Sequence, residues 1–216
     1  MDEKLMQAWQ LFSEGQVAQA KKLVAADFNL LTCEDDQLLN FMGYVKLVEQ
    51  DYEGAIQIYQ RLLTVAKKQS ANELEHIAWH QLAMVYRESK QYEQALILIE
   101  KERTIIDHYF ADDSLKKVVN DYEQGYLRLK LGDAITAKKW LENSLQEALL
   151  TDDEVAKACS YRGLGEITLA LKDKQQAKKY FQKAYEYFSK VDERQGMKEV
   201  QNFLAQLATT IPKTDN

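Results

Sequence analysis

The stretch AWHQLAMVYRESKQYEQALILI, residues 78–99, decides the fold because it contains two helix faces on either side of a short polar break. On each side, apolar residues follow the i, i+3, i+4, i+7 spacing of one helix face, first at Trp79, Leu82, Ala83 and Tyr86, then at Tyr92, Ala95, Leu96 and Ile99. The two small residues, Ala83 and Ala95, let antiparallel helices approach closely while larger neighbours fill the space beside them. The stretch therefore predicts a helical hairpin.

The same arrangement recurs along the whole chain. Contexts like that of Ala95 are found at Ala20, Ala55, Ala137 and Ala177, at intervals of 35, 40, 42 and 40 residues. Twelve residues before each of these five alanines stands another small residue, namely Ala8, Gly43, Ala83, Gly125 and Gly165. A repeated unit of this length indicates stacked helical hairpins.

Turn signals fall between the two small positions. Gly15 and Gly132 both stand five residues before the second small residue. A glycine at this point can take the left-handed conformation that ends a helix, and Asp133 can then cap the next one. These residues predict the turn of each hairpin.

The composition favours helices and disfavours several classes of protein. The 216 residues include one proline, Pro212, and 46% are hydrophobic, which suits a mostly helical chain with a substantial core. Thirty-four acidic residues against 28 basic ones give a formal charge of −6, which disfavours nucleic-acid binding. No apolar run has the length of a signal peptide or membrane span, and Cys33 and Cys159 lack the spacing of metal ligands. We therefore expect a soluble, cytoplasmic protein that has no metal or cofactor and does not associate with membranes.

The repeated pattern resembles the tetratricopeptide repeat, whose signature combines a large aromatic residue, a leucine with a small residue, a second aromatic residue, and an alanine with an aromatic residue four positions later. The third repeat carries it at Trp79, Leu82, Ala83, Tyr86, Ala95 and Ile99, and the fifth at Tyr161, Leu164, Gly165, Ala177, Phe181 and Ala184. No repeat has the family's proline after its second helix. The intervals near 40 residues resemble the longer repeats of Gram-positive peptide-sensing regulators.

The resemblance implies an all-α fold, a right-handed α-α superhelix of five helical hairpins and a C-terminal capping helix. We expect one domain, 1–210, with repeats at about 1–34, 36–70, 76–110, 114–151 and 154–190, a cap at 193–210 and a flexible tail at 211–216. The apolar stripe of MKEVQNFLAQLATT predicts the cap, because an open stack needs a terminal helix with a polar outer face. The N-terminal hairpin has no such cover, so it is either self-capped or a homodimer surface.

Ligands of the tetratricopeptide-repeat family usually bind the concave surface that the first helices form. Carried to the matching positions, the resemblance implies a groove formed by Trp9, Phe12, Asn40, Phe41, Tyr44, His80, Met84, Arg87, Tyr122, Tyr126, Lys130, Arg162 and Glu166. Aromatic and methionine side chains interspersed with Arg and Asn are typical of recognition sites. The alternative is that these rings pack between adjacent first helices, and we assign Tyr44 and Tyr126 to the groove.

Several functions compete. The first is a non-catalytic scaffold that binds a peptide or a partner's helix in the groove. The second is a peptide-sensing regulator related to the Gram-positive proteins, but without their DNA-binding module, since the first repeat begins within the first ten residues. An enzyme is the third and is disfavoured, because no paired catalytic groups are evident.

Two further patterns have structural explanations. His76 and His80, in ELEHIAWHQ, do not form the HExxH zinc motif and are expected at solvent or groove positions. Lysine pairs follow the second alanine of three repeats, at Lys21 and Lys22, Lys138 and Lys139, and Lys178 and Lys179. They favour a solvated outer face, with binding of an acidic partner as the alternative.

Overall fold

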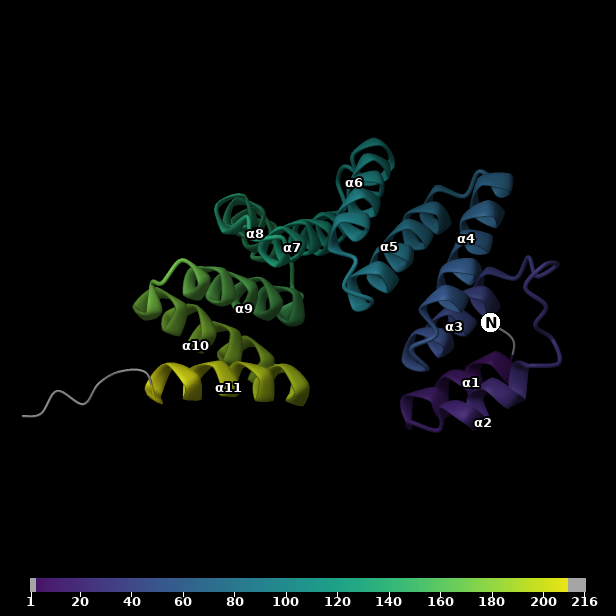
Figure 1. Ribbon diagram of the computed structural model, residues 1–216, viewed down its shortest axis with the longest axis horizontal. Coiled ribbons are helices and arrows are strands. Elements are labelled where there is room, and N and C mark those ends of the chain that lie inside the picture. Colours follow the sequence, from purple (N-terminus) through teal and green to yellow (C-terminus); the bar gives the residue numbers. More distant parts are fainter. Residues whose placement is uncertain (1–2, 210–216) are drawn as a thin grey trace, which may run out of the picture. The chain divides into compact units, whose positions relative to one another are not determined.

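The computed structural model describes residues 3–209, and over this range the chain forms eleven α-helices and no strand (Figure 1). In chain order these are α1 (Glu3–Ser13), α2 (Val17–Val24), α3 (Asp36–Val48), α4 (Tyr52–Gln69), α5 (Asn72–Glu88), α6 (Tyr92–Tyr109), α7 (Ser114–Lys130), α8 (Ala134–Ala148), α9 (Glu154–Ala170), α10 (Lys174–Lys190) and α11 (Arg194–Thr209). The predicted all-α fold of five hairpins and a capping helix is confirmed. The predicted tail, 211–216, and the last residue of the predicted cap lie outside the described residues.

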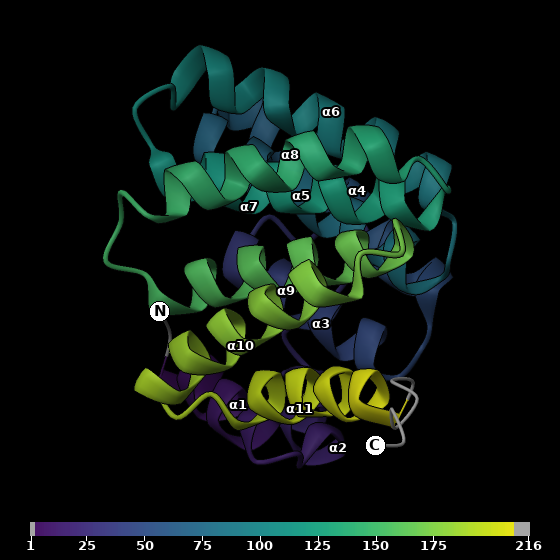
Figure 2. The same cartoon turned by 90° about the vertical axis from the view of Figure 1, so that its left-hand side faces the viewer.

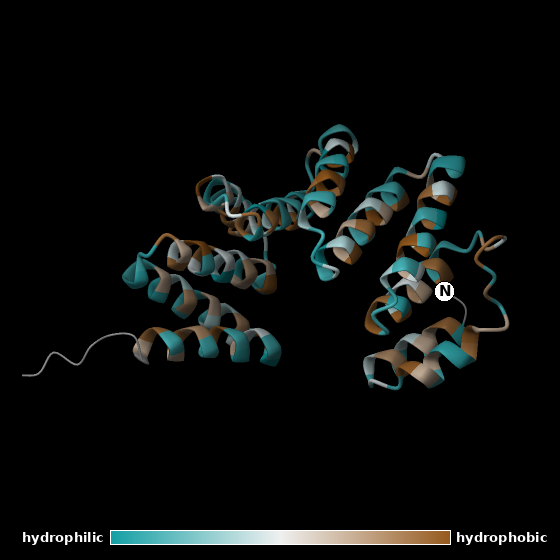
Figure 3. Cartoon of the chain, viewed as in Figure 1, coloured by the Kyte–Doolittle hydropathy of each residue, from teal (hydrophilic) through white to brown (hydrophobic). Residues whose placement is uncertain are grey.

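The chain divides into two compact units, Met1–Ile105 and Ile106–Asn216, with the boundary inside α6. The core of the first unit includes Phe41, Tyr59 and Leu62, all fully buried. In the second unit α10 packs against both α9 and α11, and these three helices lie side by side in both views (Figures 1 and 2). Apolar and polar residues alternate along the helices rather than forming long apolar segments (Figure 3). None of the described helices is long and apolar enough to cross a membrane.

The paired small residues mark the closest approach of the helices in a hairpin. A Cβ atom added to Gly43 would lie 2.3 Å from Tyr59, and one added to Gly165 would lie 2.6 Å from Phe181. Gly125 has the same relation to Leu141, at 2.7 Å. Each of these large side chains stands four residues after the second alanine of its repeat. A glycine in the first helix therefore makes room for a bulky residue from the second helix.

The residue types at the two positions vary together along the chain. Where the first small residue is alanine, at Ala8 and Ala83, the position sixteen residues later holds a β-branched aliphatic residue, Val24 or Ile99, and both are buried. Glycine is instead matched with Tyr59, Leu141 or Phe181. Because protein interiors are close-packed, this matching keeps the helices of each hairpin in contact despite changes in side-chain size.

Each hairpin turn contains a left-handed residue five positions before the second alanine. Gly15 and Gly132 have φ values of 78° and 89°, as predicted. The other three hairpins place Gln50, Lys90 and Lys172 there, with φ values of 58°, 63° and 67°. The turn geometry is thus common to all five hairpins, although only two of them use glycine.

Aspartates cap most of the helices after a turn. The Asp133 carboxylate accepts a hydrogen bond of 3.0 Å from the Thr136 N–H, which confirms the predicted cap of α8. The same contact begins α3, α4, α7, α9 and α10, where the capping residues are Asp35, Asp51, Asp113, Asp153 and Asp173. Such caps satisfy backbone N–H groups that have no partner within the helix.

Candidate functional site

A groove of about 520 Å³ opens between α3 and α5 in the first unit. We call it the unit-1 groove, and it is lined by Tyr44, Leu47, Val48, Gln50, Tyr52, His80, Gln81, Met84, Arg87 and Glu88. The Gln81 side chain donates a hydrogen bond of 2.8 Å to the Tyr44 hydroxyl, which joins the two helices across its floor. The volume lies within the range of small-molecule and peptide side-chain sites.

A buried carboxylate contacts two histidines of α5, one of which lines the unit-1 groove. Glu102 of α6 is completely buried, and its oxygens lie 3.0 Å from His76 Nε2 and 3.1 Å from His80 Nδ1. Burial alone would raise the pKa of Glu102, but the hydrogen bonds from the two histidines outweigh it and lower the pKa to about 2. The ionised carboxylate therefore fixes the orientation of His80, the histidine that lines the groove.

This contact explains the two histidines that are four apart in the sequence. Among the described residues, no group of histidine, cysteine and acidic side chains is arranged to hold a metal ion. His80 lines the unit-1 groove, which is one of the two positions expected for it. His76 is instead largely buried against Glu102. The sequence could not reveal this arrangement, because Glu102 is 22 residues from His80 and lies on the following helix.

A second hollow in the first unit, of about 310 Å³, is lined by Trp9, Asp36, Gln37, Asn40, Leu74 and Ile77. We call it the Trp9 hollow. The Trp9 ring stands edge-on to Phe41 and Tyr44, with centroids 5.0 and 5.5 Å apart. Trp9 therefore belongs partly to an aromatic cluster and partly to a surface hollow.

In the second unit, a groove of about 330 Å³ is formed by α7, α9 and α11. This unit-2 groove is lined by Tyr122, Tyr126, Arg162, Glu166, Glu199, Asn202, Phe203 and Gln206. The rings of Tyr122 and Tyr126 are stacked, with centroids 6.3 Å apart and planes 16° from parallel. Lys130 Nζ lies 4.8 Å from the centroid of Tyr126, on the ring's face.

Arg162 organises the polar part of the unit-2 groove. Its guanidinium donates to the Tyr122 hydroxyl at 2.9 Å and pairs with Glu199 at 2.5 Å. Glu166 lies further away, with its carboxylate 3.8 Å from Arg162 Nε. Burial raises the pKa of Glu166 despite the nearby guanidinium, because desolvation disfavours the charged carboxylate. The groove therefore combines an aromatic wall with polar groups of both charges.

The structure divides the residues that the sequence assigned to the groove. Eight of them line one of the two grooves, and two line the Trp9 hollow. Phe41 is completely buried, so its side chain belongs to the core and is unavailable to a ligand. Phe12 packs edge-on against Trp9 at 5.7 Å, beside the same aromatic cluster. The alternative of structural rings is therefore correct for Phe41.

Four lining residues come from α11, a helix that the sequence indicated only as a cap. Glu199, Asn202, Phe203 and Gln206 all line the unit-2 groove. Phe203 also stacks on Phe181, with centroids 4.7 Å apart, so α11 covers the core and forms a groove wall. The i, i+3, i+7 spacing of the three polar residues is the signal that could have indicated this second face.

Two segments of the sequence match known repeat profiles. Residues 120–190 and residues 76–101 each match a profile described as tetratricopeptide repeat. The chain contains repeats of the tetratricopeptide-repeat (TPR) family at these residues. The matched segments contain the pairs of small residues in repeats three, four and five, which confirms the resemblance seen in the sequence. A comparison of this TPR protein with curated proteins finds no match.

Solved structures share the TPR fold. A signal transduction ATPase with numerous domains and a tetratricopeptide-repeat sensor, from Pyrococcus horikoshii, is 16% identical with a TM-score of 0.76, over 93% of this chain and 31% of that one. BtubC from P. vanneervenii is 14% identical with a TM-score of 0.64, and the match covers 99% of this chain and 92% of that one. The apo form of RapI is 15% identical with a TM-score of 0.65, and the match covers 96% of this chain and 70% of that one. At these identities the likeness is one of fold.

Proposed function

We propose that this TPR protein is a non-catalytic scaffold that binds an extended peptide, or an exposed segment of a partner protein, in the unit-1 and unit-2 grooves. Its family consists largely of protein-binding repeats, which supports a scaffold over an enzyme. The fold alone does not define a function, so the proposal depends on the groove residues.

One regularity carries the proposal. In every hairpin, the residues three before and one after the first small residue lie one helical turn apart on the same face of the first helix. Leu5 is buried and lines no groove, and Met84 is only 9% exposed although it lines one. The residues at these positions that line a groove or the Trp9 hollow are Trp9, Asn40, Tyr44, His80, Met84, Tyr122, Tyr126, Arg162 and Glu166. The repeat thus presents its most varied and most aromatic positions at hollows in the surface.

The chemistry of these positions suits a peptide. Tyrosine rings offer rigid contact area with little rotamer entropy to lose. Amide side chains at Gln81, Asn202 and Gln206 can both donate to and accept from a peptide backbone. Arg162 and Arg87 add guanidinium groups, which are enriched at binding hot spots. Each groove therefore combines anchors with groups that could set the orientation of a peptide.

The test begins with selection of binders from a random peptide library displayed on phage. The selected peptides are then measured by fluorescence anisotropy against Asn202→Ala, in the unit-2 groove, and Arg87→Gln, in the unit-1 groove. Matched controls are Gln201→Ala on α11 and Lys90→Gln in the turn after α5, since neither residue lines a groove. We expect at least one groove variant to weaken binding about tenfold or more, as at a hot spot, and the controls to change it less than about twofold. Equal effects in groove and control variants would refute the proposal.

Ligand sensing is a second candidate. The similar repeats of the Pyrococcus horikoshii ATPase are described as its sensor, and the RapI structure is described as an apo form. A regulator of this kind would change conformation when its peptide binds, whereas a passive scaffold would not. Small-angle X-ray scattering with and without a selected peptide distinguishes the two. The predicted homodimer through α1 and α2 would be detected in the same measurements as a doubled molecular mass.

A further inference from the structure

Helix α10 is basic in a protein that is otherwise acidic. Its 17 residues include five lysines and a single acidic residue, Glu186, whereas the chain as a whole has a formal charge of −6. All five lysines are exposed, and they are Lys174, Lys178, Lys179, Lys183 and Lys190. At 100° per residue, Lys179, Lys183 and Lys190 lie about opposite the buried stripe that contains Ala177, Phe181, Ala184 and Phe188. Lys174 and Lys178 lie on one flank of the helix, about 50° and 90° from that stripe. We call the five exposed lysines together the α10 lysine face.

This charge pattern opposes the local stability of the helix. Lys174 and Lys178 are four residues apart, as are Lys179 and Lys183, and like charges at this spacing repel. Lys174 is also the first residue of α10, where the helix dipole disfavours a positive charge. Within the described part of the chain, Lys174, Lys178 and Lys179 pair with no carboxylate. Local rules are most often broken where a function requires it.

The preceding repeat provides a comparison within the same unit. Lys138 and Lys139 of α8 occupy the register positions of Lys178 and Lys179. In α8 a glutamate follows four residues later, and Lys138 lies 3.7 Å from Glu142. The matching position in α10 is Gln182, so the charge remains uncompensated. Repeat geometry alone therefore does not account for the excess of positive charge on α10.

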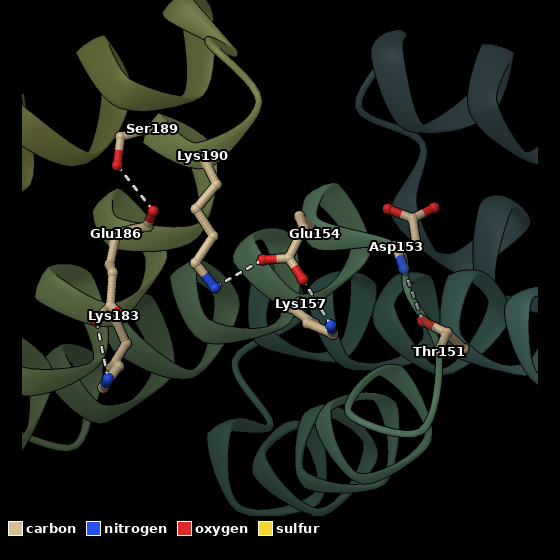
Figure 4. A network of polar contacts seen from close by, with 8 residues as sticks. All are labelled: Thr151, Asp153, Glu154, Lys157, Lys183, Glu186, Ser189 and Lys190. Atoms are coloured by element: carbon tan, nitrogen blue, oxygen red, sulfur yellow. Dashed lines mark hydrogen bonds and ion pairs between the residues drawn. The ribbon is translucent and has the colours of Figure 1, made fainter.

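Tyrosines form a platform beside the lysines. Lys190 Nζ lies 4.1 Å from the centroid of Tyr187, and the Tyr187 ring stacks on Tyr161 with centroids 5.5 Å apart. Lys190 and Lys157 also share Glu154, each at 2.7 to 2.8 Å (Figure 4). Figure 4 places Lys183 and Glu186 on the same helix as Lys190, with a contact of 2.8 Å between them. Lys183 and Lys190 are thus paired with carboxylates of this chain, so the uncompensated charge of α10 comes from Lys174, Lys178 and Lys179.

We propose that the α10 lysine face, with Tyr161 and Tyr187 beside it, docks an acidic segment of a partner protein. The basic surface follows one helix of about 25 Å, which an extended segment of about eight residues would span. A nucleic acid fits less well, since a long polyanion would also meet the field of a chain whose net charge is −6. No residue of α10 lines either groove, so this surface is independent of the proposed groove function.

The experiment measures binding of a fluorescein-labelled deca-glutamate peptide by anisotropy, at low and at high salt. The test variant is Lys178→Gln/Lys179→Gln, and the matched control is Lys138→Gln/Lys139→Gln, which removes the same charge from the same register positions of α8. At low salt we expect the test variant to weaken binding about fivefold and the control to weaken it less than about twofold. Binding should fall at high salt, since exposed charges are screened. Circular dichroism melting curves check that both variants fold.

Several results would overturn the proposal. Equal losses in the two variants would mean that only net charge matters, and absence of binding at low salt would mean that the lysines are merely solvated. Tighter binding of an oligothymidine of equal charge would indicate a nucleic-acid surface. Self-association that is lost in the Lys178→Gln/Lys179→Gln variant, without peptide binding, would assign the face to a second copy of the chain. Loss of peptide binding in the groove variant Asn202→Ala would place the acidic segment in the groove instead.

Discussion

Replacement of Gly165 by alanine tests the close approach on which every hairpin depends. The new Cβ would lie 2.6 Å from Phe181 Cε1 and 2.7 Å from Cδ1, whereas carbon atoms in contact are about 3.5 to 4.0 Å apart. The ring must therefore move by about 1 Å. Phe181 is completely buried and stacks on Phe203 of α11 with planes 3° from parallel, so this movement disturbs the capping helix as well.

The expected cost is the difference between two effects. Overpacking a well-filled site typically costs about 1–3 kcal/mol, and loss of good ring stacking adds up to about 1 kcal/mol. Alanine is also a better helix former than glycine, which returns about 1 kcal/mol. We therefore expect Gly165→Ala to lower the free energy of unfolding by about 1–2 kcal/mol.

The natural repeats supply the compensating change. Ala83 is matched with Ile99 in the third hairpin, so Phe181→Ile should relieve the clash of Gly165→Ala. Urea unfolding followed by circular dichroism is measured for both single variants and the double variant. We expect the double variant to be more stable than the sum of the single effects by about 1 kcal/mol or more, as for residues in contact. In the control cycle Phe188→Ile replaces Phe181→Ile, and its effect should add to that of Gly165→Ala within about 0.5 kcal/mol. Additive effects in both cycles would refute the size matching between Gly165 and Phe181.

The remaining predictions concern packing, a turn and a buried charge. Ala177→Leu inserts a large side chain at a completely buried position, so we expect a loss of about 1–3 kcal/mol or more, and an unchanged melting temperature would contradict the repeat register. Lys90→Gly should raise the free energy of unfolding by about 0.5–1 kcal/mol, because the φ of 63° at this position suits glycine. A free energy of unfolding below that of wild type, measured by urea unfolding, would exclude strain at this turn. Glu102→Gln should lose about 3 kcal/mol near neutral pH, because the folded-state pKa is lowered from an ordinary 4.5 to about 2. A carboxylate with a lowered folded-state pKa stabilises the fold at pH values above its unfolded-state pKa. The difference in stability between wild type and Glu102→Gln should therefore shrink as the pH falls from about 4.5 towards about 2. A difference in melting temperature that stays constant over this range would show that His76 and His80 do not stabilise the carboxylate.

Much of the fold could be predicted because the repeat encodes packing locally. The spacing of twelve residues between small positions reflects two helices joined by a tight turn, and Gly132 and Asp133 mark the end of one helix and the start of the next. The same register that placed Gly165 also placed Tyr122 and Arg162 on a groove-facing strip. These features depend on neighbours within about 40 residues, which a periodic sequence makes visible.

The rest depended on which helix covers which residue. Phe41 lies on the predicted face, but the neighbouring Trp9 covers it, so a groove position in the repeat became a core position here. The sequence did not indicate that Asn202 and Gln206 line a groove, because the apolar stripe of α11 identifies only the buried side of that helix. Glu102 was missed because a buried carboxylate has no sequence signature until its partners, His76 and His80, are placed beside it.

Photo-crosslinking of a selected peptide would locate the surface of the protein that binds it. A peptide obtained from the display selection is synthesised with a benzophenone side chain, irradiated in complex with the wild-type protein, and the modified residues are identified by mass spectrometry. If peptides bind in the grooves, we expect adducts at groove residues such as Met84 or Tyr126, and we expect these adducts to be lost on competition with unlabelled peptide. Competable adducts confined to the second helices of the hairpins, with none on α3, α5, α7, α9 or α11, would contradict binding in the grooves.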